Sequence, residues 1–140
     1  MAPEEVAVED IVRILREART IAVVGLSDKP ERASYRVASY LQRQGYRILP
    51  VNPKIRESLG VRAVGSLREI GEPVDLVDVF RRAECVPPVA EDALAMRPLP
   101  KVFWMQLGIR NEEAAAKLRA AGVRVVQDRC ALADHRAYLA

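Results

Sequence analysis

The sequence has few of the residues that would define a disulfide-rich or metal-binding protein. It contains two cysteines, Cys85 and Cys130, and a single histidine, His135. The cysteines have no C-x-x-C spacing and few neighbours of the metal-ligating kind. We therefore predict no disulfide framework and no metal site, and we expect a reducing, cytoplasmic compartment.

Long apolar runs and dense basic runs are also missing. No apolar stretch approaches the ~20 residues that a membrane span requires. The acidic residues Glu4, Glu5, Glu9 and Asp10 interrupt the amino-terminal region, so a signal peptide is not expected. No basic run is interleaved with aromatic residues, and the net charge is only +3. We expect neither a membrane nor a nucleic acid as partner, and an anionic small ligand fits this mild charge.

The residues that are present indicate one soluble α/β domain. The chain has 140 residues, of which 50% are hydrophobic and 29% charged. This length is enough for a single domain with a real core, residues 1–140, but too short for a nucleotide domain and a separate catalytic domain.

One stretch, residues 21–32, organises the rest of the chain. Ile21 to Val24 form an unbroken apolar run, typical of a parallel strand buried on both faces. The run ends at Gly25, and a polar loop with two basic residues follows. A helical pattern then begins at Ser34 and ends near Gly45. A strand, a glycine turn and a helix in this order form the first half of a nucleotide-binding βαβ unit, whose turn amides receive a phosphate.

The glycine pattern departs from the dinucleotide fingerprint G-x-G-x-x-G. Gly25, Ser27 and Pro30 occupy the three glycine positions. Ser27 hinders the close approach of a pyrophosphate but adds a hydroxyl donor. Pro30 stiffens the loop. On its own, this pattern is equally consistent with an ordinary βα turn.

The second predicted strand, residues 47–51, ends in a basic loop. Proteins that bind NAD usually have Asp or Glu here to hold the ribose hydroxyls, but this chain has Asn52, Pro53, Lys54 and Arg56, and no carboxylate before Glu57. Cations suit a phosphate on the ribose, which indicates NADP or coenzyme A (CoA) rather than NAD. The alternative is a solvated basic loop.

The remaining elements predict a Rossmann-like, doubly wound α/β fold. We expect a mostly parallel sheet of about five to six strands in the order 3-2-1-4-5, with helices on both faces. Residues 60–64 are predicted as a short edge strand, residues 74–80 as the fourth strand and residues 101–105 as the fifth. The fourth strand then lies beside the first, and the arginines at its end, Arg81 and Arg82, face residues 25–32 across the topological switch point.

Four strand ends are therefore expected to meet at one crevice. They contribute side chains suited to anions or to hydrogen bonds, and none contributes a carboxylate placed for acid–base chemistry. These residues are Ser27 and Arg32, Asn52 and Lys54, Arg81 and Arg82, and Gln106 and Gly108.

The sequence resembles the small standalone CoA-binding proteins, which are similar to the amino-terminal domain of the succinyl-CoA synthetase alpha subunit. The segments that carry the resemblance cover nearly the whole chain after Thr20. They are IAVVGLSDKPERASYRVASYL, RILPVNPK, VDLVDVFRRAECVPPV, VFWMQLGIRNEEAAAKLRAAG and VVQDRC.

The resemblance implies a Rossmann-like CoA-binding fold and a set of site residues. It implies that residues 25–32 and 52–54 hold the phosphates and the adenosine, and that residues 80–82 and 106–109 line the rest of the groove. The cofactor-binding residues it implies are Gly25, Ser27, Lys29, Pro30, Arg32, Asn52, Pro53, Lys54, Phe80, Arg81, Arg82, Gln106, Gly108 and Ile109. The synthetase also has a ligase domain with a phosphorylated histidine, for which this chain has no room.

We therefore expect a module that binds CoA or an acyl-CoA without catalytic residues of its own. One alternative is an NADP-dependent oxidoreductase, although the chain has no Tyr-x-x-x-Lys motif and no Cys–His pair. Another is a CoA-ligase subunit that needs a partner chain. The acyl group, the protein partner and the oligomeric state are not defined by the sequence.

Two reactive residue types remain to be placed. His135 has no glycine-rich context that would present a phosphohistidine, so we interpret it as structural. Cys130 follows Arg129 and precedes a predicted helix, which could lower the pKa of its thiol. A mixed disulfide with the CoA thiol is therefore a minority hypothesis, and a small buried residue is the simpler interpretation.

Overall fold

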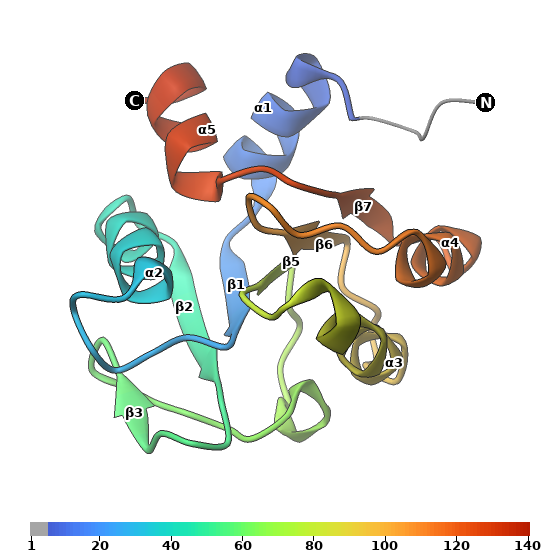
Figure 1. Ribbon diagram of the computed structural model, residues 1–140. Helices are drawn as coiled ribbons and strands as arrows, with labels where there is room; N and C mark the ends of the chain where they lie inside the picture. The colour runs from blue at the N-terminus through green and yellow to red at the C-terminus, as the bar shows by residue number, and fades with distance from the viewer. Residues whose placement is uncertain (1–5) are drawn as a thin grey trace.

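The structure, a computed structural model, describes residues 6–140 and consists of alternating strands and helices (Figure 1). The acidic residues Glu4 and Glu5 lie outside this range. Between residues 6 and 140, no helix is long and apolar enough to cross a bilayer. The elements are α1 (Val8–Glu17), β1 (Thr20–Val24), α2 (Ala33–Arg43), β2 (Arg47–Val51), β3 (Glu57–Ser58), β4 (Val61–Arg62), the 3-10 helix η1 (Leu67–Glu69), β5 (Leu76–Val79), the 3-10 helix η2 (Ala83–Cys85), α3 (Val86–Leu94), β6 (Val102–Met105), α4 (Glu112–Ala120), β7 (Arg124–Val126) and α5 (Ala131–Tyr138).

The five strands of the main sheet are all parallel and follow the order β2-β1-β5-β6-β7. β1 therefore lies between β2 and β5, with Val24 opposite both Val51 and Val79. Every residue of β5 and β6 is buried, as in other parallel sheets that helices cover on both faces. The predicted Rossmann-like α/β fold is confirmed, and so is the position of residues 74–80 beside the first strand.

The predicted edge strand, residues 60–64, is not a strand of the main sheet. Its first part belongs to a two-stranded antiparallel hairpin, in which Val61 of β4 pairs with Ser58 of β3. Only Val64 joins the main sheet, through a single parallel bridge to Val51. The turn at Leu59 and Gly60 reverses the chain, which favours local hairpin pairing over a long third strand.

Two layers of helices cover the sheet. α1, α2 and α5 lie over one face, and α3 and α4 over the other (Figure 1). On the first face, Trp104 is fully buried, and its indole Nε1 donates to the carbonyl of Arg129 at 2.7 Å. Phe103, the residue before it in β6, is also fully buried and packs toward the other face.

Residues that favour a helix start are found at the beginning of several helices. The Asn111 side chain caps α4 by accepting from the Ala114 amide at 2.9 Å. Ser66 caps η1 by accepting from the Arg68 amide at 3.1 Å, and prolines occupy the first turn of α3. Val8 at the start of α1 is 42% exposed, because it lies beyond the buried residues Ile11, Ile14 and Leu15 of that helix.

One polar residue lies inside the sheet without a partner. Asp78 of β5 is fully buried between Val23 of β1 and Trp104 of β6. Neither of its carboxylate oxygens has a hydrogen-bond partner in residues 6–140. Burial away from water therefore raises the pKa of Asp78 well above its ordinary value.

Candidate functional site

A cleft of about 600 Å³ lies at the carboxyl ends of β1, β2 and β5. Three loops form its walls: the β1–α2 loop, the β2–β3 loop and the segment after β5. The lining residues are Gly25, Ser27, Asp28, Lys29, Arg32, Ala33, Ser34, Asn52, Lys54, Ile55, Phe80 and Arg81. The cleft is thus at the topological switch point that the sequence predicts.

The β1–α2 loop is fixed by hydrogen bonds at Ser27. The Ser27 amide donates to Oγ of Ser34 at 3.0 Å, and Oγ of Ser58 donates to the Ser27 carbonyl at 2.8 Å. The Ser27 hydroxyl oxygen accepts from the Lys29 amide at 3.0 Å, which forms a local turn. The Ser27 hydroxyl, which the sequence analysis expects to be a donor, thus accepts a hydrogen bond within the loop, and its hydrogen remains available to donate to a ligand.

Asn52 connects two walls of the cleft. Its Nδ2 donates to the carbonyl of Leu26 at 3.0 Å, and its Oδ1 accepts from the amide of Lys54 at 2.9 Å. Asn52 is only 8% exposed. It holds the β1–α2 loop against the end of β2 and orients the chain that carries Lys54.

At Gly25, the β1–α2 loop lies in close contact with the segment after β5. Its φ is +87°, and a Cβ atom here would lie 2.3 Å from the Phe80 carbonyl oxygen. The structure thus shows why a glycine is needed here, because the backbone of Phe80 occupies the space that a side chain would take.

The amino end of α2 opens onto the cleft. Ala33 and Ser34 line it, and the first four amides of an α-helix have no acceptor within the helix. The residue before the helix, Arg32, makes no side-chain cap, and the first turn contains no acidic residue. α4 differs, since Asn111 caps it and two glutamates occupy its first turn. The start of α2 therefore presents uncompensated donors and the positive end of the helix dipole.

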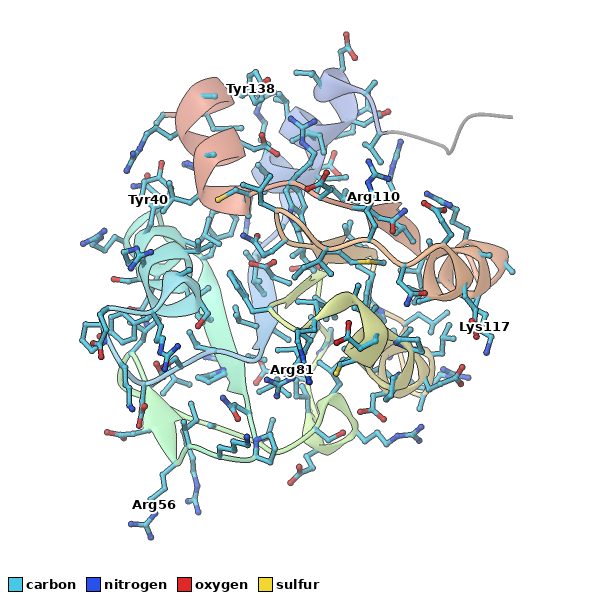
Figure 2. The ribbon with its side chains drawn as sticks, viewed as in Figure 1. Tyr40, Arg56, Arg81, Arg110, Lys117 and Tyr138 are labelled. Carbon is cyan, nitrogen blue, oxygen red and sulfur yellow. The ribbon has the colours of Figure 1, made fainter. Side chains whose placement is uncertain are left out.

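Four cationic side chains surround the same cleft: Lys29, Arg32, Lys54 and Arg81. Within residues 6–140, none of them lies within 4.0 Å of a carboxylate, although ion pairs such as Arg47–Glu72, at 2.7 Å, occur elsewhere on the surface. Figure 2 shows Arg81 near the middle of the molecule, below the ends of β1 and β5 in this view. Asp28 is the single carboxylate among the lining residues. The electrostatic balance of the cleft is positive.

The structure separates the predicted arginine pair. Arg81 lines the cleft, whereas the side chain of Arg82 is 80% exposed and pairs with Glu84 at 3.4 Å. Two prolines also lie outside the cleft lining. Pro30 borders a hollow between α2 and α5, and Pro53 is exposed beside Gly65. These three predicted site residues are therefore not among those that line the cleft.

The residues after β6 also lie away from the cleft lining. The Gln106 side chain is buried, and its Oε1 accepts from the Ala131 amide at 3.2 Å, so it caps the start of α5. The Gly108 amide donates to Oδ1 of Asp128 at 2.6 Å. Ile109 packs against the core on the α3–α4 side. This strand end is used to anchor the carboxyl-terminal part of the chain.

Three residues that line the cleft, Ala33, Ser34 and Ile55, fall outside the predicted site, and a fourth, Asp28, lies within the predicted range 25–32 without having been singled out. Ala33 and Ser34 could have been found, because the first turn after a phosphate-binding loop contributes amides whatever its side chains are. Ile55 follows Lys54 directly, but an apolar residue in a basic loop carries no signal of its own.

His135 and the cysteines lie outside the cleft lining. His135 is 7% exposed, and its Nδ1 hydrogen-bonds with the Tyr40 hydroxyl at 2.9 Å between α2 and α5. Burial lowers the pKa of His135. This geometry supports a structural role. Cys85 and Cys130 are half-buried free thiols, and Cys130 packs against the core under α5.

The parallel sheet, its switch-point cleft and the amide-rich helix start define a Rossmann-like α/β domain. The family model described as a CoA binding domain matches residues 19–136. The chain therefore belongs to the family of CoA binding domains.

Similarity to individual proteins agrees with this family. The chain is 49% identical over 126 residues to the uncharacterized protein YneT of Bacillus subtilis (strain 168), covering 90% of this chain and 92% of YneT. It shares 40% identity with the solved structure of cell-free ID.343 from Thermus thermophilus, with a TM-score of 0.90, covering 96% of this chain and all of the other.

A shorter similarity connects the chain to an enzyme subunit. It is 42% identical over 59 residues to the alpha subunit of ADP-forming acetate–CoA ligase II of Pyrococcus furiosus, covering 41% of this chain but 13% of that subunit. The predicted resemblance to CoA-binding proteins is confirmed by the family model, and this shorter match connects the chain to a subunit of a CoA ligase.

Proposed function

We propose that this protein binds CoA or an acyl-CoA in the cleft between the β1–α2 loop and the segment after β5. The observation that carries the proposal is the coincidence of two features in one cleft. The uncapped start of α2 and four cations without carboxylate partners both face it. CoA supplies the matching charges, a pyrophosphate and a phosphate on the ribose.

The pyrophosphate fits at the start of α2. The amides of the first turn, the Ser27 hydroxyl and the side chains of Arg32 and Arg81 are the donors on this side of the cleft. Guanidinium groups bind phosphate oxygens with paired hydrogen bonds, and helix amides add donors without a change in conformation. Lys29 adds a further positive charge at the rim.

The adenosine fits against the β2–β3 loop. Ile55 and Phe80 offer the apolar surface that a base requires, and Lys54 stands where the ribose phosphate would lie. Asn52 orients this loop through its bond to Leu26. This assignment explains why Lys54 follows β2 at the place where NAD-binding proteins usually have an acidic residue.

We propose binding without catalysis by this chain. Among the described residues that line the cleft, Asp28 is the one acid, and it is exposed. Neither cysteine nor His135 is among them. A carrier or sensor of CoA in a reducing, cytoplasmic compartment fits this arrangement.

Calorimetric titration tests the proposal. We expect CoA to bind, dephospho-CoA to bind more weakly, and NADH to show no measurable binding. NADPH is the ligand that decides between this function and an NADP-dependent reductase, because it also carries a ribose phosphate and a pyrophosphate but has a nicotinamide nucleotide in place of the pantetheine arm of CoA. Tighter binding of NADPH than of CoA would overturn the proposal.

A further inference from the structure

A second hollow lies between α2 and α5, outside the cleft and on the outer surface of the molecule. This α2–α5 groove has a volume of about 340 Å³, and the residues that define it are Tyr35, Arg36, Tyr40, Arg43, Leu132 and Arg136. The proposed CoA site does not use any of these six residues. Figure 2 shows Tyr40 where the two helices meet.

The floor of the groove is rigid. Tyr40 is 7% exposed, and its hydroxyl is bonded to His135 of α5 at 2.9 Å. The Arg136 guanidinium lies over the Tyr40 ring, 5.4 Å from its centroid. Leu132 is half-buried beside it. The buried Tyr40 ring is thus fixed beneath Arg136, and the half-buried Leu132 beside it is the accessible apolar part of a preorganised surface, which reduces the entropy lost on binding.

The rim of the groove is strongly positive. Arg36, Arg43 and Arg136 are all exposed, and no carboxylate of residues 6–140 lies within 4.0 Å of any of them. Other arginines of the chain are paired: Arg68 with Asp92 at 2.7 Å, and Arg124 with Asp10 at 2.9 Å. The groove residues include no acidic side chain. Arg36 also donates through Nη1 to the carbonyl of Glu31, and Arg136 stacks on Tyr40, so both are held at the rim and keep further N–H donors for carboxylates from another molecule.

We propose that the α2–α5 groove binds an acidic segment of a partner protein, with carboxylates on the arginine rim and an apolar side chain on the Tyr40–Leu132 floor. Arginine and tyrosine are enriched at protein interfaces, and a partly buried arginine–carboxylate contact is stronger than an exposed one. A short hollow with an apolar floor fits a peptide better than the backbone of a nucleic acid, which needs a longer basic track.

The groove lies next to the proposed CoA site, although the proposal does not depend on that site. Pro30 borders the groove, while its neighbours Asp28 and Lys29 line the cleft. The β1–α2 loop thus separates the two, and a protein in the groove would contact the outer side of the loop that encloses the cleft.

The test uses a fluorescently labelled acidic peptide with a Glu-Glu-Leu repeat and measures its binding by anisotropy. The first variant combines Arg36→Gln, Arg43→Gln and Arg136→Gln. The control combines Arg13→Gln, Arg16→Gln and Arg97→Gln, which removes the same charge from exposed positions on other surfaces. Circular dichroism melting confirms that both proteins fold.

We expect the groove variant to weaken peptide binding by about tenfold or more and the control by less than about threefold. A second variant, Leu132→Ser, keeps all charges and should weaken the Glu-Glu-Leu peptide but not a Glu-Glu-Ser peptide. Equal losses in the two triple variants would overturn the proposal, because they would show only a general effect of net charge. Absence of binding to the natural protein would also overturn it, as would tighter binding of a DNA duplex or of phosphatidylserine vesicles through the same arginines.

Discussion

The backbone at Phe80 occupies the space that a side chain on Gly25 would need. A Cβ atom at Gly25 would lie 2.3 Å from the Phe80 carbonyl oxygen and 3.0 Å from Nη1 of Arg81. This contact joins the turn after β1 to the segment after β5, so it sets the distance between two walls of the cleft. The glycine is required by the protein itself, before any ligand is considered.

The first prediction follows from that contact. Gly25→Ala should destabilise the protein by about 2–4 kcal/mol, because the variant adds a steric conflict with Phe80 to a left-handed backbone conformation. The matched control is Gly45→Ala, where φ is +102° but no atom lies within 4 Å of the added Cβ. This control should lose about 1 kcal/mol. Urea denaturation measures both, and equal losses would show that the contact with Phe80 has no cost.

The second prediction concerns the pH dependence of stability. The pKa of Asp78 is raised by burial, so the folded protein holds a proton on this carboxyl at pH values where the unfolded chain has released it. The contribution of this proton to the free energy of unfolding is fully present below about pH 4, where the unfolded chain is also protonated. It is lost as the pH rises toward the pKa of Asp78 in the folded protein. The difference in unfolding free energy between the natural protein and Asp78→Asn should therefore fall as the pH rises from about 4.

A second buried group, His135, also makes the stability depend on pH, so the natural protein and Asp78→Asn must be compared at each pH. Its pKa is lowered by burial, so its contribution has the opposite sign and is lost as the pH falls below about 6.5. Because both proteins contain His135, its effect cancels in the difference. Urea titrations at several pH values give the curve, and a difference that does not vary with pH would contradict the assigned shift at Asp78.

The third prediction separates two neighbouring cations. Lys54 lines the cleft, whereas Arg56, just before β3, lies in a separate hollow with Arg62 and points outward (Figure 2). Lys54→Gln should weaken CoA by about 1–2 kcal/mol and dephospho-CoA hardly at all, since only CoA carries the ribose phosphate. Arg56→Gln, with the same change of charge, should leave both affinities nearly unchanged. Calorimetry with both ligands gives the four values, and equal weakening of both ligands by Lys54→Gln would refute its assigned partner.

The sequence predicted the sheet well because the physical signal is strong and repeated. Apolar runs such as Ile21 to Val24 are typical of buried parallel strands, and helices between them require parallel connections. The position of the fourth strand beside the first followed from the usual doubly wound order. The prediction of an edge strand at residues 60–64 was wrong because Leu59 and Gly60 form a tight turn. This turn favours pairing between the neighbouring segments β3 and β4 over pairing with the main sheet.

The cleft was harder to predict residue by residue. Neighbouring side chains after a strand point in different directions, so Arg81 and Arg82 could not both face the cleft, and the sequence does not say which one does. Gln106 stands at a strand end, but the start of α5 uses its side chain. Asp78 lies within the predicted strand at residues 74–80. Its lack of a hydrogen-bond partner could not be predicted, because it depends on neighbours from β1 and β6 that are distant in sequence.

Arg81 provides the most direct test of the proposed CoA site, and its neighbour Arg82 provides the control. Calorimetric titration of CoA should show Arg81→Gln binding about tenfold or more weakly than the natural protein, because a guanidinium facing the phosphates is lost. Arg82→Gln, which removes the same charge from a side chain that points away, should change the affinity by less than about twofold. Equal effects of the two substitutions, or a larger effect at Arg82, would contradict the proposal that CoA lies between β1 and β5.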